Sequence, residues 1–349
     1  MNAAPQSVAP QAFHFLVLPE FSFLGLLSAL EPLRIANHFK PNSYRWHLLS
    51  SDGGPVVATN GMLLPTEGSF LEAQDVSMVF VISGFNTLTY YRADMGQWLR
   101  TVQSQGATLG AIDGGAFVLA EADLLADEAI ALHWDSHASF MERYPAIRLG
   151  TSLFEIGQRC ITCAGGTASI DMMLALIGKQ HGQALATQIS DWIILGRIRH
   201  PSDHQRLDIS SRYGLHNPKA IAAVELMQAH IEDLIAIDDL ARRVAITRRQ
   251  LERLFSAHLK CTPSQFYLQV RLDRARELLQ QTALSVTDVS VACGFGSSSY
   301  FSRAYRARFK TSPKDDRVED AQNRQQVQKF HATAHTASTG NIGNIGPLG

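Results

Sequence analysis

The sequence predicts an α/β fold for the first two thirds of the chain and an all-helical domain for the last third. Up to about residue 195, short apolar runs typical of buried strands alternate with helical patterns, as in a parallel α/β sandwich. A polar stretch with proline and glycine follows, and beyond it strand patterns nearly vanish. We therefore expect an α/β domain at 12–196, a linker at 197–217 and a helical domain at 218–317.

The strands expected in the α/β domain are short runs rich in Val, Ile, Leu and Phe. The run VSMVFVIS at 76–83 is apolar throughout, which is typical of a parallel sheet covered by helices on both faces. The other expected strands are FHFLVLP at 13–19, YRWHLLS at 44–50, ATLGAID at 107–113, AIALHW at 129–134 and RCITCAG at 159–165. Helical patterns lie between them at 22–37, 95–105, 115–125 and 166–182.

The two ends of the chain have compositions that do not build a core. Residues 1–11 are rich in Ala, Pro and Gln, and from about 318 the chain consists largely of Gln, Ala, Thr, Gly and Asn. Such segments bury too little apolar surface to offset the entropy of ordering them. We expect 1–11 and 318–349 to be disordered.

The stretch LGAIDGGAFVLAEA at 109–122 has the outline of a nucleophile elbow, a sharp strand-to-helix turn that presents one side chain at its tip. The apolar run ends at Asp113, Gly114 and Gly115 form the turn, and a helix-forming run follows. The tip residue is an aspartate, where an enzyme with this elbow carries Ser or Cys. The sequence therefore raises the question of what the turn does without its nucleophile.

Two segments of the last third repeat one pattern, at 237–259 and 286–309. Each has a short helix, a turn of about four residues, and a second helix with a Ser or Thr N-cap candidate, Thr247 or Ser297. This is the layout of a helix-turn-helix, whose second helix enters the major groove of DNA. A helical pattern at 263–282 joins the copies, so two recognition helices could occupy successive grooves about 34 Å apart.

Positive charge collects in the same part of the chain. Residues 217–317 hold 16 Lys and Arg against 11 Asp and Glu, whereas the remainder holds 15 against 21. We expect double-stranded DNA to be bound by this part alone. The side chains expected at the DNA lie on the two second helices: Thr247, Arg248, Arg249, Gln250 and Arg253, and then Ser297, Ser298, Ser299, Arg303 and Arg306.

The runs RRQLERLF, RLDRARELL and VSVACGFGSSSYFSRAYRARFKTSP resemble the DNA-binding domain of AraC/XylS-type transcription regulators. The resemblance covers 217–317. It implies a transcription regulator, in most relatives an activator, with RNA polymerase as a partner. Two positions depart from the family pattern: Ser290 replaces a usual Ala, and Lys310 replaces a Gly that adopts the left-handed conformation easily.

The α/β part resembles the PfpI-like, glutamine-amidotransferase-like domain, a flavodoxin-like sandwich. Where that domain is an enzyme, the elbow carries a nucleophilic Cys followed by His and Gly. Here Asp113, Gly114 and Gly115 occupy those positions, so we expect no catalysis and no cofactor. The two domains together resemble GlxA-type regulators across nearly the whole chain. That resemblance implies a cytoplasmic homodimer whose former active site binds a small-molecule effector.

The residues expected at the effector follow predicted strands, where open α/β sheets bind ligands. They are Glu20, Phe21, Phe23, Phe85, Asp113, Gly114, His133 and Trp134. A carboxylate beside aromatic faces suits a quaternary ammonium. The runs HWDSHASFMERYP and CAGGTASIDMMLALI resemble regulators of carnitine, glycine betaine and arginine catabolism, which favours carnitine, with arginine or another amino-acid-type metabolite as the alternative. Core packing of the aromatics and helix capping by Asp113 are the plainer interpretations.

Other classes of protein find little support. No apolar run is long enough to span a membrane, and the first residues lack the pattern of a secretory signal. Cys160 and Cys163 form a CxxC, but in a strand residues three apart point to opposite faces, so we expect no metal. His200, His204 and His216 fall in the polar linker and are expected to be solvated.

Two alternatives to an effector-controlled regulator stay open. One is an enzyme tethered to DNA, which requires turnover by the α/β domain. The other is a DNA-binding protein whose α/β part only dimerises, which predicts no dependence of DNA binding on any ligand.

Overall fold

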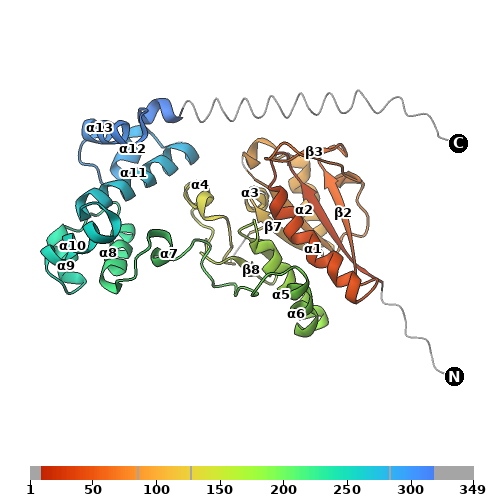
Figure 1. Cartoon of the computed structure of the whole chain (residues 1–349). Helices are drawn as coiled ribbons and strands as arrows, with labels where there is room; N and C mark the ends of the chain where they lie inside the picture. The colour runs from red at the N-terminus through yellow and green to blue at the C-terminus, as the bar shows by residue number, and fades with distance from the viewer. Residues whose placement is uncertain (1–8, 85, 126–127, 283, 318–349) are drawn as a thin grey trace, which may run out of the picture. The chain divides into compact units, whose positions relative to one another are not determined.

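A computed structural model describes residues 9–84, 86–125, 128–282 and 284–317 (Figure 1). They divide into two compact units, one of the residues up to Gln205 and one from Arg206 onward. The stretch expected to be disordered at 318–349 lies outside the described residues, as do residues 1–8. The expected disorder extended to residue 11, but Gln11 already belongs to the first strand.

The first unit is built around a seven-stranded sheet of order β5-β2-β1-β6-β7-β9-β8. Neighbouring strands pair in parallel except β8 and β9, so the expected parallel sheet ends in one antiparallel edge strand. The strands of this sheet are β1 (Gln11–Val17), β2 (Tyr44–Ser50), β5 (Gly68–Ser69), β6 (Met78–Ser83), β7 (Thr108–Asp113), β8 (Phe154–Ile156) and β9 (Cys160–Cys163). A separate antiparallel pair is formed by β3 (Val56–Val57) and β4 (Leu63–Leu64).

The prediction of a strand at 129–134 was wrong. Only Ile130 makes an isolated bridge there, with Leu149. The next residue, Ala131, donates its backbone N–H to the Thr162 hydroxyl at 2.8 Å instead of to a strand carbonyl. The place beside β9 is taken by β8, so the 129–134 segment has no backbone ladder to join.

Helices cover the two faces of the sheet, and each face has its own hydrophobic core. Strand side chains alternate between them: Phe13 and Phe15 lie in one core, and Leu16 and Leu18 lie in the other. The first core is covered by α1 (Phe23–Phe39), α5 (Ala168–His181) and α6 (Gln183–Trp192). The second is covered by α2 (Ala93–Ser104), α3 (Gly115–Glu121) and α4 (His137–Arg143), and short turns η1 (Phe70–Glu72), η2 (Thr87–Thr89) and η3 (Trp134–Ser136) complete the unit.

Cys160 and Cys163 lie on opposite faces of the sheet, as the strand pattern predicts. Cys160 belongs to the core beside α2 and α3, and Cys163 belongs to the core beside α1 and α5. Burial raises the pKa of each thiol to about 12, so both are neutral thiols at neutral pH.

The second unit consists of short helices around a core that includes Leu240, Leu251 and Phe255. Its helices are α7 (Ile209–Tyr213), α8 (Pro218–Ala229), α9 (Ile237–Arg243), α10 (Arg248–Leu259), α11 (Pro263–Gln281), α12 (Val286–Ala292) and α13 (Ser298–Phe309). The stretch expected to be a linker is thus divided: its end contains α7, and its beginning is hydrogen-bonded to the first unit.

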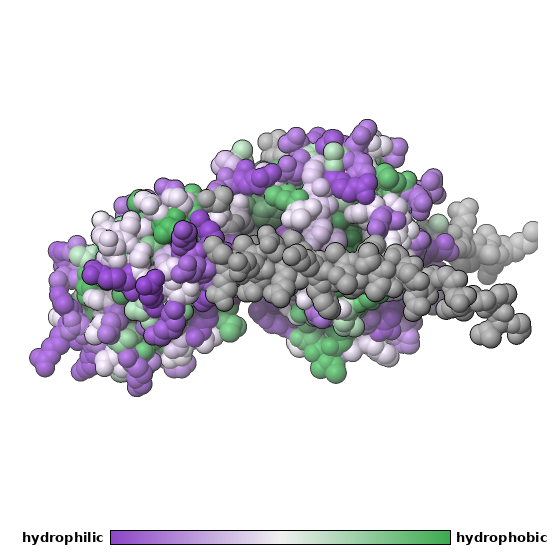
Figure 2. Space-filling view, turned by 90° about the horizontal axis from the view of Figure 1, so that it is seen from above, coloured by the Kyte–Doolittle hydropathy of each residue, from purple (hydrophilic) through white to green (hydrophobic). Residues whose placement is uncertain are grey.

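The visible surface of the molecule is mainly hydrophilic, with scattered hydrophobic areas (Figure 2). Of the helices in the described ranges, none has both the length and the hydropathy needed to cross a membrane.

Candidate ligand pocket and nucleic-acid interface

The strand order fixes where a ligand site is expected in the first unit. The chain places β2 on one side of β1 and β6 on the other, so the direction of winding reverses between β1 and β6. In open α/β sheets the crevice at the carboxyl ends of the strands at this switch point is the usual ligand site. The residues that follow β1 and β6, and the tip that ends β7, therefore belong to one candidate pocket.

The elbow predicted at the end of β7 is present. Asp113 has a φ of 56°, in the left-handed region that a non-glycine residue seldom adopts, and α3 starts two residues later. The turn is packed against the neighbouring strand: a Cβ on Gly115 would lie 2.0 Å from the Val81 carbonyl oxygen. The surrounding structure therefore holds Asp113 in a conformation that is costly by itself.

Asp113 lies in a recess that disfavours its charge. Burial raises the pKa of the carboxyl to about 7, the Gly114 backbone N–H acts in the opposite direction, and the charge of Asp135 adds to the rise. Asp135 belongs to η3, so this second carboxylate stands near the elbow although sequence reasoning missed it. On another side, the backbone of Gly165 approaches so closely that a Cβ there would lie 2.8 Å from the Asp113 Cβ.

His133 and Trp134 carry two aromatic rings directly before Asp135 in the chain. Their ring centroids are 5.4 Å apart, and both side chains are half-buried. Burial lowers the pKa of His133, which opposes protonation of the imidazole, and its Nδ1 accepts the Asp135 backbone N–H at 3.3 Å. The backbone N–H of Trp134 donates to the Gln205 side chain at 2.8 Å.

The other residues expected at the ligand lie differently. Glu20 is buried at a φ of 61°, and its Oε2 accepts from the Asn86 side chain at 2.8 Å, so it joins the ends of β1 and β6. Phe21 is fully buried in the core, with its ring 5.6 Å from that of the half-buried Phe23, which agrees with the packing interpretation. Phe85 lies outside the described residues.

A cavity of about 630 Å³ lies elsewhere, at the amino ends of β1 and β2. Its lining includes His14 and His47, whose rings stack at 5.0 Å, and Glu67, which is 2.7 Å from His47. This cavity shares no lining residue with the elbow, so its size says nothing about the candidate pocket.

The charges near the elbow are compatible with a cation. Asp113 and Asp135 both favour a positive charge nearby, and the lowered pKa of His133 disfavours a competing imidazolium. Cys163 is near enough that Asp113 contributes to its raised pKa, but a buried thiol of pKa about 12 is a poor nucleophile. Within the described ranges, no group of three or more His, Cys, Asp or Glu side chains is arranged to hold a metal ion.

The two repeats of the second unit have the same pattern of burial. Leu251 and Phe255 are buried in α10, and Phe301 and Tyr305 are buried at the equivalent places in α13. The N-cap predictions are confirmed: the Thr247 hydroxyl accepts the Gln250 backbone N–H at 3.2 Å, and Ser297 accepts that of Tyr300 at 3.4 Å. Gln250 returns a bond to the Thr247 backbone, which completes a capping box.

The polar side chains expected at DNA lie on the outer sides of these helices. All ten are exposed: Thr247, Arg248, Arg249, Gln250, Arg253, Ser297, Ser298, Ser299, Arg303 and Arg306. They are not all free to reach a phosphate, because Arg248 pairs with Glu252 at 2.9 Å and with Asp238 at 3.3 Å. The departure at Lys310 does not stop the helix from closing, since Lys310 adopts a φ of 65° and Lys260 does the same in the first copy.

Contacts that sequence reasoning missed hold the second repeat against the connecting helix α11. Arg271 donates to the carbonyls of Cys293 and Gly294, both at 2.8 Å, and lies over the Phe295 ring. The buried Asp316 accepts from Tyr305 at 2.6 Å and pairs with Arg276 at 3.0 Å. These bonds set the orientation of α13 relative to α11.

Comparison with known proteins places the chain in a family. Residues 240–318 match the family model described as a helix-turn-helix domain. The chain is 52% identical to the HTH-type transcriptional regulator CdhR of Pseudomonas aeruginosa over 88% of this chain and 92% of that protein. It is 41% identical to the HTH-type transcriptional regulator GbdR of the same species, over 90% and 86% respectively.

A solved structure supports the assignment of the first unit. The crystal structure of an AraC family transcriptional regulator from Pseudomonas putida covers 53% of this chain and all of that chain, with 26% identity and a TM-score of 0.50. Together with the double helix-turn-helix geometry of the second unit, these matches identify a DNA-binding regulator of transcription. The chain belongs to the AraC family of transcription regulators, and within it to the GlxA type, with an α/β domain followed by an AraC-type DNA-binding domain.

Proposed function

We propose that the first unit is an effector-sensing domain without catalytic activity, and that its effector is a quaternary amine such as carnitine. The observation that supports this proposal is the buried Asp113 at the switch point of the sheet, near enough to Asp135 for the two charges to interact, with Trp134 directly before Asp135 in the chain. The effector's cationic head lies between the two carboxylates and the indole ring. The effector-bound protein then binds its promoter DNA through the second unit.

The chemistry of the recess favours a cation without N–H donors. A quaternary ammonium is attracted to an aromatic face and to carboxylates, but it needs no hydrogen-bond acceptor in return. The raised pKa of Asp113 shows that its charge is poorly compensated in the unliganded chain, so a bound cation relieves an existing cost. The sequence resemblance to regulators of carnitine and glycine betaine catabolism supports the same ligand class, and arginine is the alternative.

The test is calorimetric titration of the full chain with carnitine, glycine betaine, choline and arginine. We expect carnitine to bind, and Asp113→Asn and Asp135→Asn each to weaken binding by at least tenfold because each removes a charge that faces the cation. Glu142→Gln, an exposed carboxylate on α4, is the matched control and should leave affinity unchanged. Binding of arginine but not of carnitine would favour the alternative effector.

If no amine binds, the interpretation of the first unit as a dimerisation module alone gains support. Consumption of an amine by wild type but not by Asp113→Asn would instead favour the tethered enzyme. Both results would contradict the effector proposal while leaving DNA binding by the second unit intact.

We also propose that the regulator works in the cytoplasm as a homodimer and activates transcription through contact with RNA polymerase. The family resemblance supports these points. Light scattering of the purified chain measures the oligomeric state, and a promoter fusion with and without carnitine measures the sign of regulation.

A further inference from the structure

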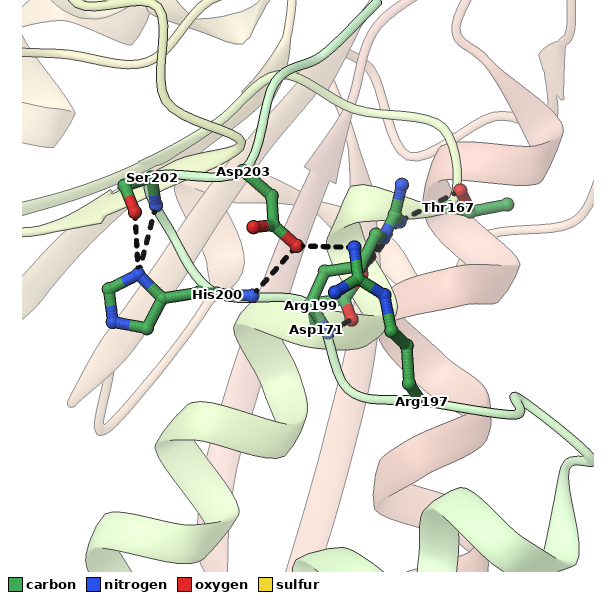
Figure 3. Close-up of polar contacts among 7 residues, drawn as sticks. All are labelled: Thr167, Asp171, Arg197, Arg199, His200, Ser202 and Asp203. Carbon is green, nitrogen blue, oxygen red and sulfur yellow. Dashed lines mark hydrogen bonds and ion pairs between the residues drawn. The ribbon is translucent and has the colours of Figure 1, made fainter. Parts of the chain in front are cut away.

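The segment 197–205, here called the clasp segment, lies on the first unit and ends where the second unit begins. Arg206, the next residue, is the first of the second unit. Figure 3 shows that side chains of the clasp segment meet Asp171 and Thr167 at the start of α5. The chain therefore passes from the first unit to the second at the end of this segment.

The first attachment is a buried ion pair. Asp171 has no exposed side-chain surface, and it accepts the backbone N–H of Arg199 at 2.7 Å and two guanidinium bonds at 2.9 and 2.6 Å (Figure 3). The Arg199 Nη2 also donates to the Thr167 hydroxyl at 2.9 Å. Both guanidinium bonds end on Asp171 Oδ2 and the backbone bond ends on Oδ1, so Asp171 and Arg199 both lose partners if the segment moves.

The second attachment is the Gln205 side chain. Its amide nitrogen donates to the carbonyls of Leu132 at 2.9 Å and Ser152 at 2.7 Å, and its carbonyl accepts the Trp134 backbone N–H at 2.8 Å. Between the two attachments, the Pro201 carbonyl accepts the Leu153 N–H at 2.8 Å. The clasp segment is therefore fixed at both ends and in the middle.

The two attachments hold two segments of the candidate pocket: the turn at 165–167 and the segment 132–135, here called its walls. Thr167 follows the Gly165 turn, whose backbone lies against Asp113. Trp134, which Gln205 holds, directly precedes Asp135, and the charge of Asp135 acts on Asp113. A ligand that enters beside Asp113 must fit between two walls that the clasp segment joins.

We propose that the clasp segment couples occupancy of the pocket to the DNA-binding unit, with Arg199 and Gln205 as its positioning residues. This inference rests on the proposed function, because it requires a ligand at Asp113. The ligand displaces the 132–135 wall relative to the 165–167 turn. Because the clasp segment cannot keep both attachments after this displacement, it shifts along the first unit, and Arg206 shifts with it. Coupling is reciprocal, so DNA binding changes effector affinity by the same factor.

The test uses the full chain, with carnitine as the probe and a DNA fragment selected for binding to this protein. Gln205→Leu removes three hydrogen bonds of the second attachment, and Arg199→Lys keeps the charge at Asp171 but loses the fork. Arg197→Gln is the matched control. Arg197 lies in the same segment and its side chain is 72% exposed, and among the described residues its ion pair is with Asp203 of that segment, at 2.8 Å (Figure 3).

Allosteric coupling usually changes affinity by about 5- to 150-fold, and we expect the change in DNA affinity caused by carnitine to fall below about twofold in Gln205→Leu and Arg199→Lys. Both variants should still bind carnitine, measured by calorimetric titration, because neither side chain is proposed to contact the ligand. Arg197→Gln should respond as wild type does. Undiminished responses in both clasp variants would overturn the coupling role.

A second measurement decides the matter if carnitine does not bind wild type, a result that refutes the proposed effector and not the clasp. If the chain exchanges between two conformations, a mutation that breaks one attachment of the clasp segment changes their ratio, even without ligand. DNA affinity of the unliganded Arg199→Lys and Gln205→Leu chains should then differ from wild type by at least about fivefold, the lower end of usual coupling, while Arg197→Gln does not. Equal affinities in all four chains would refute the clasp. Circular dichroism of each variant shows whether it is folded. If Gln205→Leu does not fold, Arg199→Lys alone is used for the test.

Discussion

At the scale of single residues, the elbow keeps the geometry of a catalytic turn and changes its chemistry. The left-handed Asp113, the glycines behind it and the close approach of Gly165 are all retained. A carboxylate at the tip attracts positive charge when it is ionised, and burial makes that charge costly. Under the proposed function, the turn would recognise a cation with no change in the backbone.

This view predicts a pH dependence of effector binding. The folded-state pKa of Asp113, about 7, is raised above the ordinary value of 3.8, so the carboxyl is mostly neutral at pH 6 and mostly ionised at pH 8. Because a cation binds the ionised form, the affinity for carnitine should rise by about tenfold between these pH values. Calorimetric titration at several pH values measures this rise.

The raised pKa of Asp113 also makes the stability of the unliganded chain depend on pH, in the opposite direction. Between pH 4 and 7 the folded chain holds a proton that the unfolded chain has lost, so the contribution of Asp113 to the free energy of unfolding decreases as pH rises through this window. Asp113→Asn should abolish the pH dependence of carnitine affinity and this contribution to the pH dependence of the free energy of unfolding. An affinity for carnitine that is equal at pH 6 and pH 8 in wild type would contradict a charged Asp113 at the ligand.

At the scale of elements, the second unit builds two recognition helices by the same rules. Both begin at a hydroxyl N-cap, bury an aromatic or leucine face and end at a left-handed lysine. These features depend on residues a few positions apart, which is why the sequence predicted them. The bonds from Arg271 and Asp316 that orient α13 join residues 11 to 40 positions apart, and no local pattern indicates them.

The exposed arginines of α10 should contribute unequally to DNA binding. Arg248 is held by Glu252 and Asp238, whereas Arg249 is exposed and forms no ion pair within the described residues. Arg249→Ala should weaken DNA binding by about 1–3 kcal/mol, since it removes a cation that is free to contact DNA. Fluorescence anisotropy with labelled DNA at several salt concentrations measures the loss.

Arg242→Ala provides the comparison. This arginine is 78% exposed on the first helix of the same motif, away from the recognition helix. Its loss should change affinity by much less than the loss of Arg249. If the two variants weaken DNA binding equally, α10 is not the helix that contacts DNA most closely.

At the scale of the whole molecule, the sequence predicted the two domain types and most strands and helices, because hydrophobic periodicity is local. It missed what depends on the tertiary fold. Asp135 reaches Asp113 through the loop that replaces the expected strand, and Gln205 reaches Leu132 across 73 positions. A polar stretch that looks like a linker in the sequence is bound to the first unit in the structure, since Arg199 pairs with the buried Asp171 and Gln205 bonds to backbone carbonyls.

The division into two units predicts how the chain unfolds. Each unit buries its own core, so differential scanning calorimetry of the full chain should show two transitions. Carnitine at about 100 times its dissociation constant should stabilise the α/β unit by about 2.7 kcal/mol and raise the midpoint of its transition. Operator DNA should raise mainly the midpoint of the other transition.

Asp113→Asn should remove the shift caused by carnitine and keep the shift caused by DNA, because the mutation alters only the effector pocket. A carnitine shift that survives in Asp113→Asn would place the effector elsewhere in the chain, and the cavity beside His14 and His47 would then be the next site to mutate.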